Sequence, residues 1–151
     1  MTTTGQRISN SPVQHYISGC AKNDRTGRRY KRVVRIIKRI RNHMAENFDL
    51  PQATRDRAKN TPSFLIESLV YNCLDTDHFQ NALVYDDVVA VLRHLSYVLA
   101  NRGNGAALLG ASTWAWWYEV NGLKPLFGPE QTWTVGTAAE FIGLAKEYMG
   151  V

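Results

Sequence analysis

Hydrophobic and polar positions recur at helical spacing in four segments of this chain, and most regularly in residues 27–46. There, one helical stripe is apolar and the opposite stripe is almost entirely cationic. The apolar stripe comprises Val33, Ile37, Ile40 and Met44, and the other comprises Lys31, Arg35, Lys38 and Asn42 at 4-3-4 spacing. The pattern predicts a helix that packs with one face and presents cations with the other.

Three further segments have the same period. In residues 62–74, apolar positions spaced by four predict a helix, with Thr61 as N-cap and Pro62 as its first residue. Residues 86–100 begin with two aspartates at the positive end of the expected helix dipole, and residues 135–148 follow Thr134 as a cap. No segment alternates with period two, so the predicted class is all-α, a single compact bundle of about four to six helices.

The connecting segments are less regular. Residues 1–19 contain the breaks Ser11-Pro12 and Ser18-Gly19 and predict an irregular arm, so that residues 20–151 form the helical domain. Residues 47–60 read as a polar loop with room for a short helical turn. Arg102–Gly105 should end the helix predicted for residues 86–100. For residues 106–128, which hold three of the four tryptophans, helix and irregular structure both stay open.

Charge is concentrated in one place. Ten Lys and Arg residues lie between Lys22 and Arg41 against the single acid Asp24, which gives this stretch +9 while the rest of the chain nets −4. Like charges one helical turn apart repel. A solvated face does not need such an imbalance, so the stretch is expected to face phosphates, either of a nucleotide or of a nucleic acid.

Composition favours one intracellular domain. The chain has 151 residues, 44% of them hydrophobic, enough to bury a core but short of two ordinary domains. Cys20 and Cys73 match no zinc or redox spacing, which favours reduced thiols. No apolar run approaches the roughly 20 residues that cross a bilayer, and residues 1–5 do not resemble a signal peptide. We therefore expect a cytoplasmic protein without membrane contact.

Catalytic motifs are not recognisable in these residues. Asp75-Thr76-Asp77 is a DxD, but it follows an apolar helix and reads as the loop that ends it. The four histidines form no pairs at metal-ligand spacing, and the glycines of residues 103–110 lack the GK[ST] ending of a phosphate loop. The sequence therefore predicts no catalytic residue and no metal site, and the residues alone do not indicate an autonomous enzyme.

One arrangement could bind a nucleotide. Ser63 falls in the first turn of a predicted helix, where free backbone N–H groups favour an anion, and Phe64 offers a ring on which a base could stack. A cation from Lys38 would complete the cradle. Alternatively, the Thr-Pro-Ser sequence is only a helix start and Phe64 is only a core residue.

Several blocks of the sequence together resemble a known family. They are Ser11-Pro12, Gln14-His15-Tyr16 and Gly19; residues 29–39; Pro62–Glu67 with Tyr71-Asn72; and, in the tail, Glu119–Asn121, Leu123-Lys124, Leu126-Phe127, Trp133-Thr134, Phe141 and Tyr148. In this order they resemble the C-terminal helical lobe of bacterial cGAS/DncV-like nucleotidyltransferases, relatives of oligoadenylate synthetase.

The resemblance implies a two-lobed enzyme of antiviral signalling that joins nucleoside triphosphates into cyclic or linear oligonucleotides. Its N-terminal lobe carries a Gly-Ser turn and three metal-binding carboxylates. In the helical lobe, Lys38 and Ser63 would contact the donor triphosphate, and Phe64, where relatives often have Tyr, would lie near the base. Lys31 and Arg35 would add positive charge. Because the 151 residues hold no such turn or carboxylate set, Mg²⁺ and ATP or GTP are expected only with a catalytic lobe.

Three interpretations of such a chain compete: a split subunit or relic, an expressed fragment, and a free-standing helical module. We favour a lobe that binds nucleoside triphosphate and is inactive alone; half of a split enzyme with a separate catalytic lobe is one form that such a lobe could take. The alternative is a free-standing nucleic-acid-binding or protein-interaction module without nucleotide chemistry, in which the basic helix binds nucleic acid.

Overall fold

The computed structural model describes residues 12–100 and 117–151, and within these ranges the chain is helical. The helices are α1 (Pro12–Arg25), α2 (Arg29–Glu46), α3 (Gln52–Lys59), α4 (Ser63–Tyr71), the four-residue α5 (Asp75–His78), α6 (Val84–Ala100) and α7 (Val135–Met149). The described residues contain no strand, only an isolated antiparallel bridge between Tyr118 and Pro125. The predicted all-α class is confirmed.

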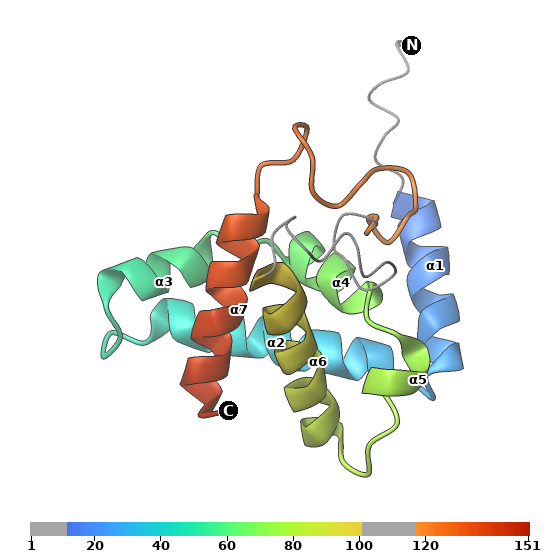
Figure 1. Ribbon diagram of the computed structural model, residues 1–151, viewed down its shortest axis with the longest axis horizontal. Coiled ribbons are helices and arrows are strands. Elements are labelled where there is room, and N and C mark those ends of the chain that lie inside the picture. Colours follow the sequence, from blue (N-terminus) through green and yellow to red (C-terminus); the bar gives the residue numbers. More distant parts are fainter. Residues whose placement is uncertain (1–11, 101–116) are drawn as a thin grey trace.

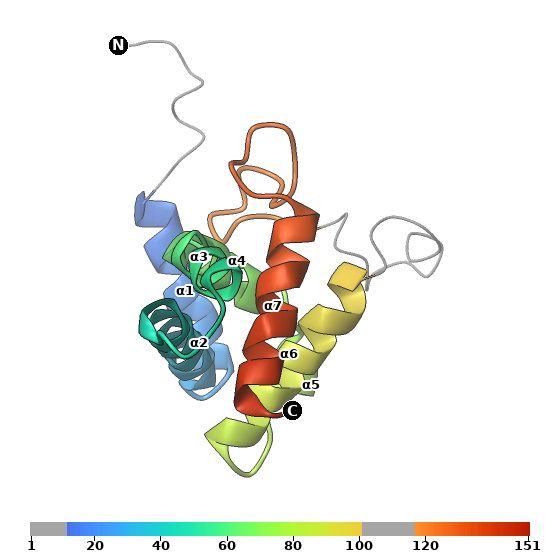
Figure 2. The same cartoon turned by 90° about the vertical axis from the view of Figure 1, so that its left-hand side faces the viewer.

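Helix α2 is the centre of the bundle and packs against α1, α3, α4, α6 and α7. Figure 2 shows α1 to α4 gathered on one side, with α6 and α7 side by side on the other. The core between the two groups is apolar, and burial of this surface supplies the main stabilisation. Its largest fully buried side chains include Ile37, Met44, Leu65, Leu92, Leu95 and Phe141.

All four predicted helices are present, and three of them, α2, α6 and α7, lie close to their predicted bounds, because their apolar periods were long and uninterrupted. In α2, Val33, Ile37 and Met44 are buried as expected, while Ile40 is partly buried. Helix α6 begins two residues before the predicted start. Helix α7 follows the predicted cap, where the Thr134 hydroxyl accepts a 3.1 Å hydrogen bond from the Thr137 backbone N–H.

The predicted cap of α4 is wrong. The helix begins at Ser63 after an extended Pro62, and no side chain caps it. The Thr61 hydroxyl instead donates a 2.7 Å hydrogen bond to the Arg57 carbonyl, at the end of α3. This bond satisfies an orphan carbonyl of the preceding helix, so Thr61 serves the end of α3 and not the start of α4.

Two segments are more helical than expected. The irregular arm predicted for residues 1–19 is wrong for residues 12–19, because α1 begins at Pro12, a residue well suited to a first helical turn, and continues through Gly19. Gly19 is buried against the Tyr30 ring, so packing offsets its low helix propensity. Residues 47–60 contain the eight-residue α3, longer than the expected turn. Residues 1–11, the predicted stop at Arg102–Gly105 and residues 106–116 lie outside the described residues.

Residues 117–134 pass over α4 at the end of the bundle near α1 (Figures 1 and 2). For residues 117–128, where the sequence left helix and irregular structure open, the structure is irregular. Its turn is held by the Leu126 N–H, which donates to the Trp117 carbonyl at 2.9 Å. The Trp133 indole donates to the Leu126 carbonyl, also at 2.9 Å. These bonds fix the Trp133 ring beside the first turn of α4.

Candidate nucleotide-binding site

Two helices position the residues of the predicted phosphate cradle. Lys38 and Arg41, one turn apart on α2, face Ser63 and Glu67, one turn apart on α4. The Lys38 ammonium forms an ion pair with the Glu67 carboxylate. The Arg41 guanidinium donates to the Ser63 hydroxyl at 3.0 Å and to the Thr61 carbonyl at 2.6 Å. Lys38 and Ser63 therefore belong to one seam between α2 and α4, not to opposite faces of the domain.

A cleft with a volume of about 320 Å³ opens beside this seam, between α1 and α2. We call it the α1–α2 cleft. It contains three of the predicted cations, Lys31, Arg35 and Lys38, and a single carboxylate, Glu67. The full lining is His15, Tyr16, Gly19, Tyr30, Lys31, Val34, Arg35, Lys38 and Glu67. Three cations against one carboxylate favour an anionic occupant.

Glu67 organises the cleft. One carboxylate oxygen pairs with Lys38, and the other accepts a 2.6 Å hydrogen bond from His15 Nε2. The Tyr30 hydroxyl donates to the Glu67 backbone carbonyl at 3.1 Å. The Lys38 and Glu67 side chains are 26% and 25% exposed, so solvent reaches the pair. A phosphate that binds Lys38 has to compete with this carboxylate or displace it.

Phe64 lies next to the cleft but does not line it. Its ring stacks on the His15 ring, with centroids 5.1 Å apart, and its centroid is 6.1 Å from that of Trp133. Phe64 instead lines a second concavity of about 200 Å³, the Phe64–Trp133 hollow, together with Glu119, Lys124, Gln131 and Trp133. His15 contacts both Glu67 and Phe64, so it separates the cleft from the hollow.

The remaining predicted cations differ in how they are held. Lys31 places its ammonium 5.3 Å from the centroid of the Tyr16 ring and 3.4 Å from Cys20 Sγ. Arg35 is exposed and lines two concavities, the α1–α2 cleft and a groove of about 370 Å³ between α2 and the first residue of α6, Val84. That groove also contains Arg32 and Arg39. The structure thus divides the basic helix into a face toward α1 and α4 and a face toward solvent.

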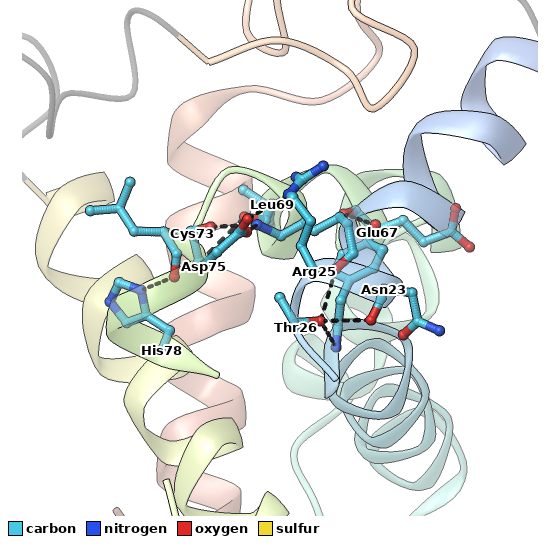
Figure 3. Close-up of polar contacts among 11 residues, drawn as sticks. Asn23, Arg25, Thr26, Glu67, Leu69, Cys73, Asp75 and His78 are labelled. Carbon is cyan, nitrogen blue, oxygen red and sulfur yellow. Dashed lines mark hydrogen bonds and ion pairs between the residues drawn. The ribbon is translucent and has the colours of Figure 1, made fainter. Parts of the chain in front are cut away.

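Not every basic residue of the +9 stretch faces outward, and sequence reasoning missed this. Lys22 is 3% exposed, and its ammonium donates to the Cys73 carbonyl at 2.8 Å and pairs with Asp75. Figure 3 shows Asp75 beside Cys73 and Arg25, and the Arg25 guanidinium donates to Asp75 at 2.7 Å. Burial lowers the pKa of Lys22, and Asp75 opposes this shift. The first aspartate of the DxD is therefore a structural partner of α1.

Arg29 is likewise directed inward, toward the fully buried Asp87 of α6. The Asp87 carboxylate also accepts hydrogen bonds from the backbone N–H and the side-chain amide of Asn81, at 3.0 and 2.9 Å. Asp87 lies in the first turn of α6, as predicted. Its buried ion pair with Arg29 also joins the start of α2 to α6.

Two general properties complete the description. Among the described residues, no group of three or more His, Cys, Asp or Glu side chains could hold a metal ion. Within the same ranges, no helix is long and apolar enough to cross a membrane. The DxD at residues 75–77, predicted as a helix-ending loop, belongs to the short helix α5.

The structure defines the chain as an all-α domain with a cationic cleft beside the seam of two helices. Comparison with known proteins identifies its family. Residues 17–150 match the family described as the cGAS/DncV-like nucleotidyltransferase C-terminal helical domain, and the chain belongs to this family. The resemblance inferred from the sequence blocks is confirmed. The chain is a helical lobe of the nucleotidyltransferase type.

The relatives are cyclic nucleotide synthases. The chain is 34% identical over 146 residues to the cyclic dipyrimidine nucleotide synthase CdnE of Legionella pneumophila. This alignment covers 97% of the chain and 43% of that protein. It is 35% identical over 91 residues to the cyclic GMP-AMP synthase CdnE03 of Staphylococcus schleiferi, covering 60% of the chain and 26% of that protein.

A solved structure of similar fold is that of the Elizabethkingia meningoseptica CdnE cyclic dinucleotide synthase with GTP and Apcpp. It aligns with a TM-score of 0.75 and 26% identity, over 94% of the chain and 45% of that protein. The chain therefore spans less than half the length of these relatives.

Proposed function

We propose that this helical lobe binds the phosphates of a nucleoside triphosphate at the seam between α2 and α4, with Lys38 and Ser63 as contacts and Lys31 and Arg35 supplying positive potential. The observation that supports the proposal is that Lys38 and Ser63 belong to the same seam, through Glu67 and Arg41, beside a cleft that holds three cations, although Ser63 does not itself line that cleft. A relative of similar fold was solved with GTP, which supports a triphosphate ligand.

Both residues contact protein groups in the structure, but only Lys38 has to exchange its partner. Lys38 would leave Glu67 for a phosphate oxygen, and the Ser63 hydroxyl would donate to a phosphate oxygen while it still accepts from Arg41. Such charge-assisted hydrogen bonds contribute about 1.5–3 kcal/mol each. The first turn of α4 adds free backbone N–H groups, which favour an anion at Ser63.

Calorimetric titration of the 151-residue chain with ATP and GTP tests the proposal. Lys38→Ala or Ser63→Ala should each weaken binding about tenfold or more. Arg93→Ala is a matched control, because Arg93 is an exposed cation on α6 outside the cleft lining. Equal affinity of parent and Lys38→Ala, or a lack of measurable triphosphate binding, would refute the proposal.

We further propose that these residues form no product alone, because two-metal phosphoryl transfer needs a carboxylate set. Mg²⁺ chemistry would come from a catalytic lobe, which we propose as a partner of this chain in a split enzyme. The family resemblance also favours cytoplasmic antiviral signalling. Incubation of the purified chain with Mg²⁺ and four triphosphates should give no oligonucleotide, and product that survives repurification would contradict this.

A second candidate function is polyanion binding on the solvent face of α2, independent of nucleotides. It is favoured by the groove that places Arg32, Arg35 and Arg39 together. Binding to heparin or duplex RNA should weaken steeply with salt, through counterion release, and should be lost in Arg32→Glu/Arg39→Glu but kept in Lys38→Ala. If the double variant binds as the parent does, the groove has no such role.

A protein-interaction role is the remaining alternative. It is favoured by exposed apolar side chains on α1, where Val13, Tyr16 and Ile17 are 69%, 66% and 53% exposed. These residues recur one turn apart and so share one helix face. Thermal stabilisation of the chain by ATP or GTP is expected if nucleotide binding is the function, and its absence would favour the interaction role.

A further inference from the structure

The Phe64–Trp133 hollow has the properties of a site for a flat heterocycle. Its volume of about 200 Å³ is below the range typical of whole-ligand pockets, so it suits part of a ligand. Two aromatic rings inclined at 38° form its apolar side. Their centroids are 6.1 Å apart, too close for a base to enter between them, and the His15 ring already stacks on Phe64, so a base would pack on the outer face of Trp133.

The polar side of the hollow contains a buried carboxylate. Glu119 is 3% exposed, and no cation pairs with it in the described part of the chain. One of its oxygens accepts a 2.7 Å hydrogen bond from the Gln131 amide. Within residues 12–100 and 117–151, the other oxygen has only a 3.4 Å contact with the Asn121 amide, which leaves acceptor capacity unused there. Burying a carboxylate is costly unless its hydrogen-bonding capacity is satisfied.

The nearest cation lining the hollow does not neutralise this carboxylate. The Lys124 ammonium lies 3.8 Å from the Glu130 carboxylate, which is 72% exposed. Gln131 is fixed by a second bond, in which its amide donates to the Pro125 carbonyl at 2.9 Å. Glu119 is therefore held in one place by amides and can accept from a ligand.

A carboxylate accepts best from two adjacent N–H donors in one plane. Among the four bases of nucleoside triphosphates, guanine alone presents such a pair, N1–H and N2–H. Adenine and cytosine present one amino group beside a ring-nitrogen acceptor, which a carboxylate repels. Uracil presents a single N–H between two carbonyl acceptors.

We propose that the hollow binds the base of the nucleotide and selects guanine, with Glu119 accepting from the guanine N1–H and N2–H edge and Trp133 packing against the face of the base. This proposal rests on the proposed phosphate site, because Ser63 and Phe64 are consecutive residues and a phosphate at Ser63 keeps its nucleoside near the hollow. Glu119 would thus be the specificity-determining residue of this lobe.

The first test changes only the ligand. Guanosine, inosine and adenosine monophosphates are titrated into the 151-residue chain, and binding is followed by calorimetry. Inosine lacks the 2-amino group, so it should bind about tenfold more weakly than guanosine, and adenosine more weakly still. Equal binding of the guanosine and inosine ligands, tighter binding of adenosine, or no detectable guanosine binding would overturn the proposal.

The second test changes the carboxylate. Glu119→Gln should weaken GTP about tenfold and equalise the four triphosphates, while inorganic tripolyphosphate binds as it does to the parent. Glu130→Gln is the matched control, since it removes an exposed carboxylate from the same segment and should change nothing. A guanine preference that persists in Glu119→Gln would also overturn the proposal.

Tripolyphosphate separates this proposal from the phosphate site. If tripolyphosphate binding is absent from the parent or unaffected by Lys38→Ala, the phosphate site fails. If tripolyphosphate binds and depends on Lys38 but base selection is absent, only the guanine site fails. A melting curve for Glu119→Gln checks its fold, and the inosine comparison in the unchanged protein decides the proposal if that variant unfolds.

Discussion

Two lysine–carboxylate pairs join the basic stretch to the region around α4, and they differ in burial. Lys22 pairs with Asp75 where the lysine side chain is 4% exposed, whereas Lys38 pairs with Glu67 where both side chains are about one quarter exposed. The chemical groups are of the same kind. Only the surroundings distinguish a structural pair from one that a ligand can reach.

The surroundings of Lys22 are closed by aromatic rings. Its ammonium lies 5.1 Å from the centroid of Phe79, 5.5 Å from Tyr71 and 5.9 Å from Tyr30, within the range of cation–π attraction. The Cys73 carbonyl and Asp75 accept its hydrogen bonds. The contacts of Lys22 that the structure describes thus all come from the protein, and its side chain is almost closed to solvent.

The surroundings of Lys38 are open. The same cleft that exposes it contains Lys31 and Arg35, so removing Glu67 from the pair would leave three cations facing one concavity. A partly exposed ion pair contributes only about 0–1 kcal/mol, so an incoming phosphate could replace it at little cost. Burial, and not charge density, separates the cations of this stretch that hold the fold from those that a ligand could reach.

The largest expected effect is on stability, from Asp75→Ala. This change leaves the Lys22 ammonium buried with the Cys73 carbonyl as its remaining acceptor, and breaking a buried pair costs about 3–5 kcal/mol. Because Asp75 is itself 29% exposed, we expect about 3 kcal/mol, measured by urea unfolding. Asp24→Ala, an exposed acid on α1, should change stability by less than about 0.5 kcal/mol. Equal stability of the two variants would contradict the structural role of Lys22.

A pH profile sharpens the same contrast. Burial would raise the pKa of Asp75, but hydrogen bonds from Arg25 and Lys22 outweigh it and hold the pKa below the ordinary value of 3.8. The pair therefore stabilises fully above that ordinary value, and its contribution is lost as the pH falls through the lower, folded-state pKa.

We expect the stability difference between the parent and Asp75→Asn to be constant above about pH 5 and to shrink below about pH 4. Urea unfolding between pH 2.5 and 7 measures this stability difference. Its change with pH should be no larger than the linkage to a single carboxylate allows. Asp24→Asn should give a flat difference profile. A profile for Asp75→Asn that stays level into acid would show that the carboxylate is not held ionised by Lys22 and Arg25.

On the open side of the comparison, Glu67→Gln should favour the ligand. The change removes the carboxylate that competes with phosphate for Lys38, so triphosphate should bind about fivefold more tightly, while stability falls by less than about 1 kcal/mol. Titration calorimetry and urea unfolding of the same sample measure both quantities. Weaker triphosphate binding would mean that Glu67 positions Lys38 and does not compete for it.

The sequence predicted the helices with long apolar periods, and packing explains the ones it missed. Helices α2, α6 and α7 were predicted because their stripes continue for several turns. Helix α1 was missed because its buried positions include Gly19 and Lys22, which no hydrophobic pattern reports. Helix α3 buries only Ala58, so it too has little apolar signal.

For the candidate site, the family resemblance brought Lys38 and Ser63 together, and the structure places them on facing helices. The family resemblance did not reveal that Glu67 pairs with Lys38. The available signal was that Glu67 follows Ser63 by one helical turn and so lies on the same face of the helix. Burial of Lys22 could not be predicted, because the three aromatic rings around its ammonium, Tyr30, Tyr71 and Phe79, come from separate segments of the chain.

The smallest expected effect comes from the outer member of the buried cluster. Arg25 donates to the same carboxylate as Lys22, at 2.7 Å, but its side chain is 52% exposed. Solvent screens an exposed pair, so Arg25→Ala should cost only about 0.5 kcal/mol in urea unfolding at neutral pH. Combining it with Asp75→Ala should add almost nothing, since the partner is already gone. A loss with Arg25→Ala as large as that with Asp75→Ala would mean that the exposed arginine, and not the buried lysine, holds α1 to the rest of the domain.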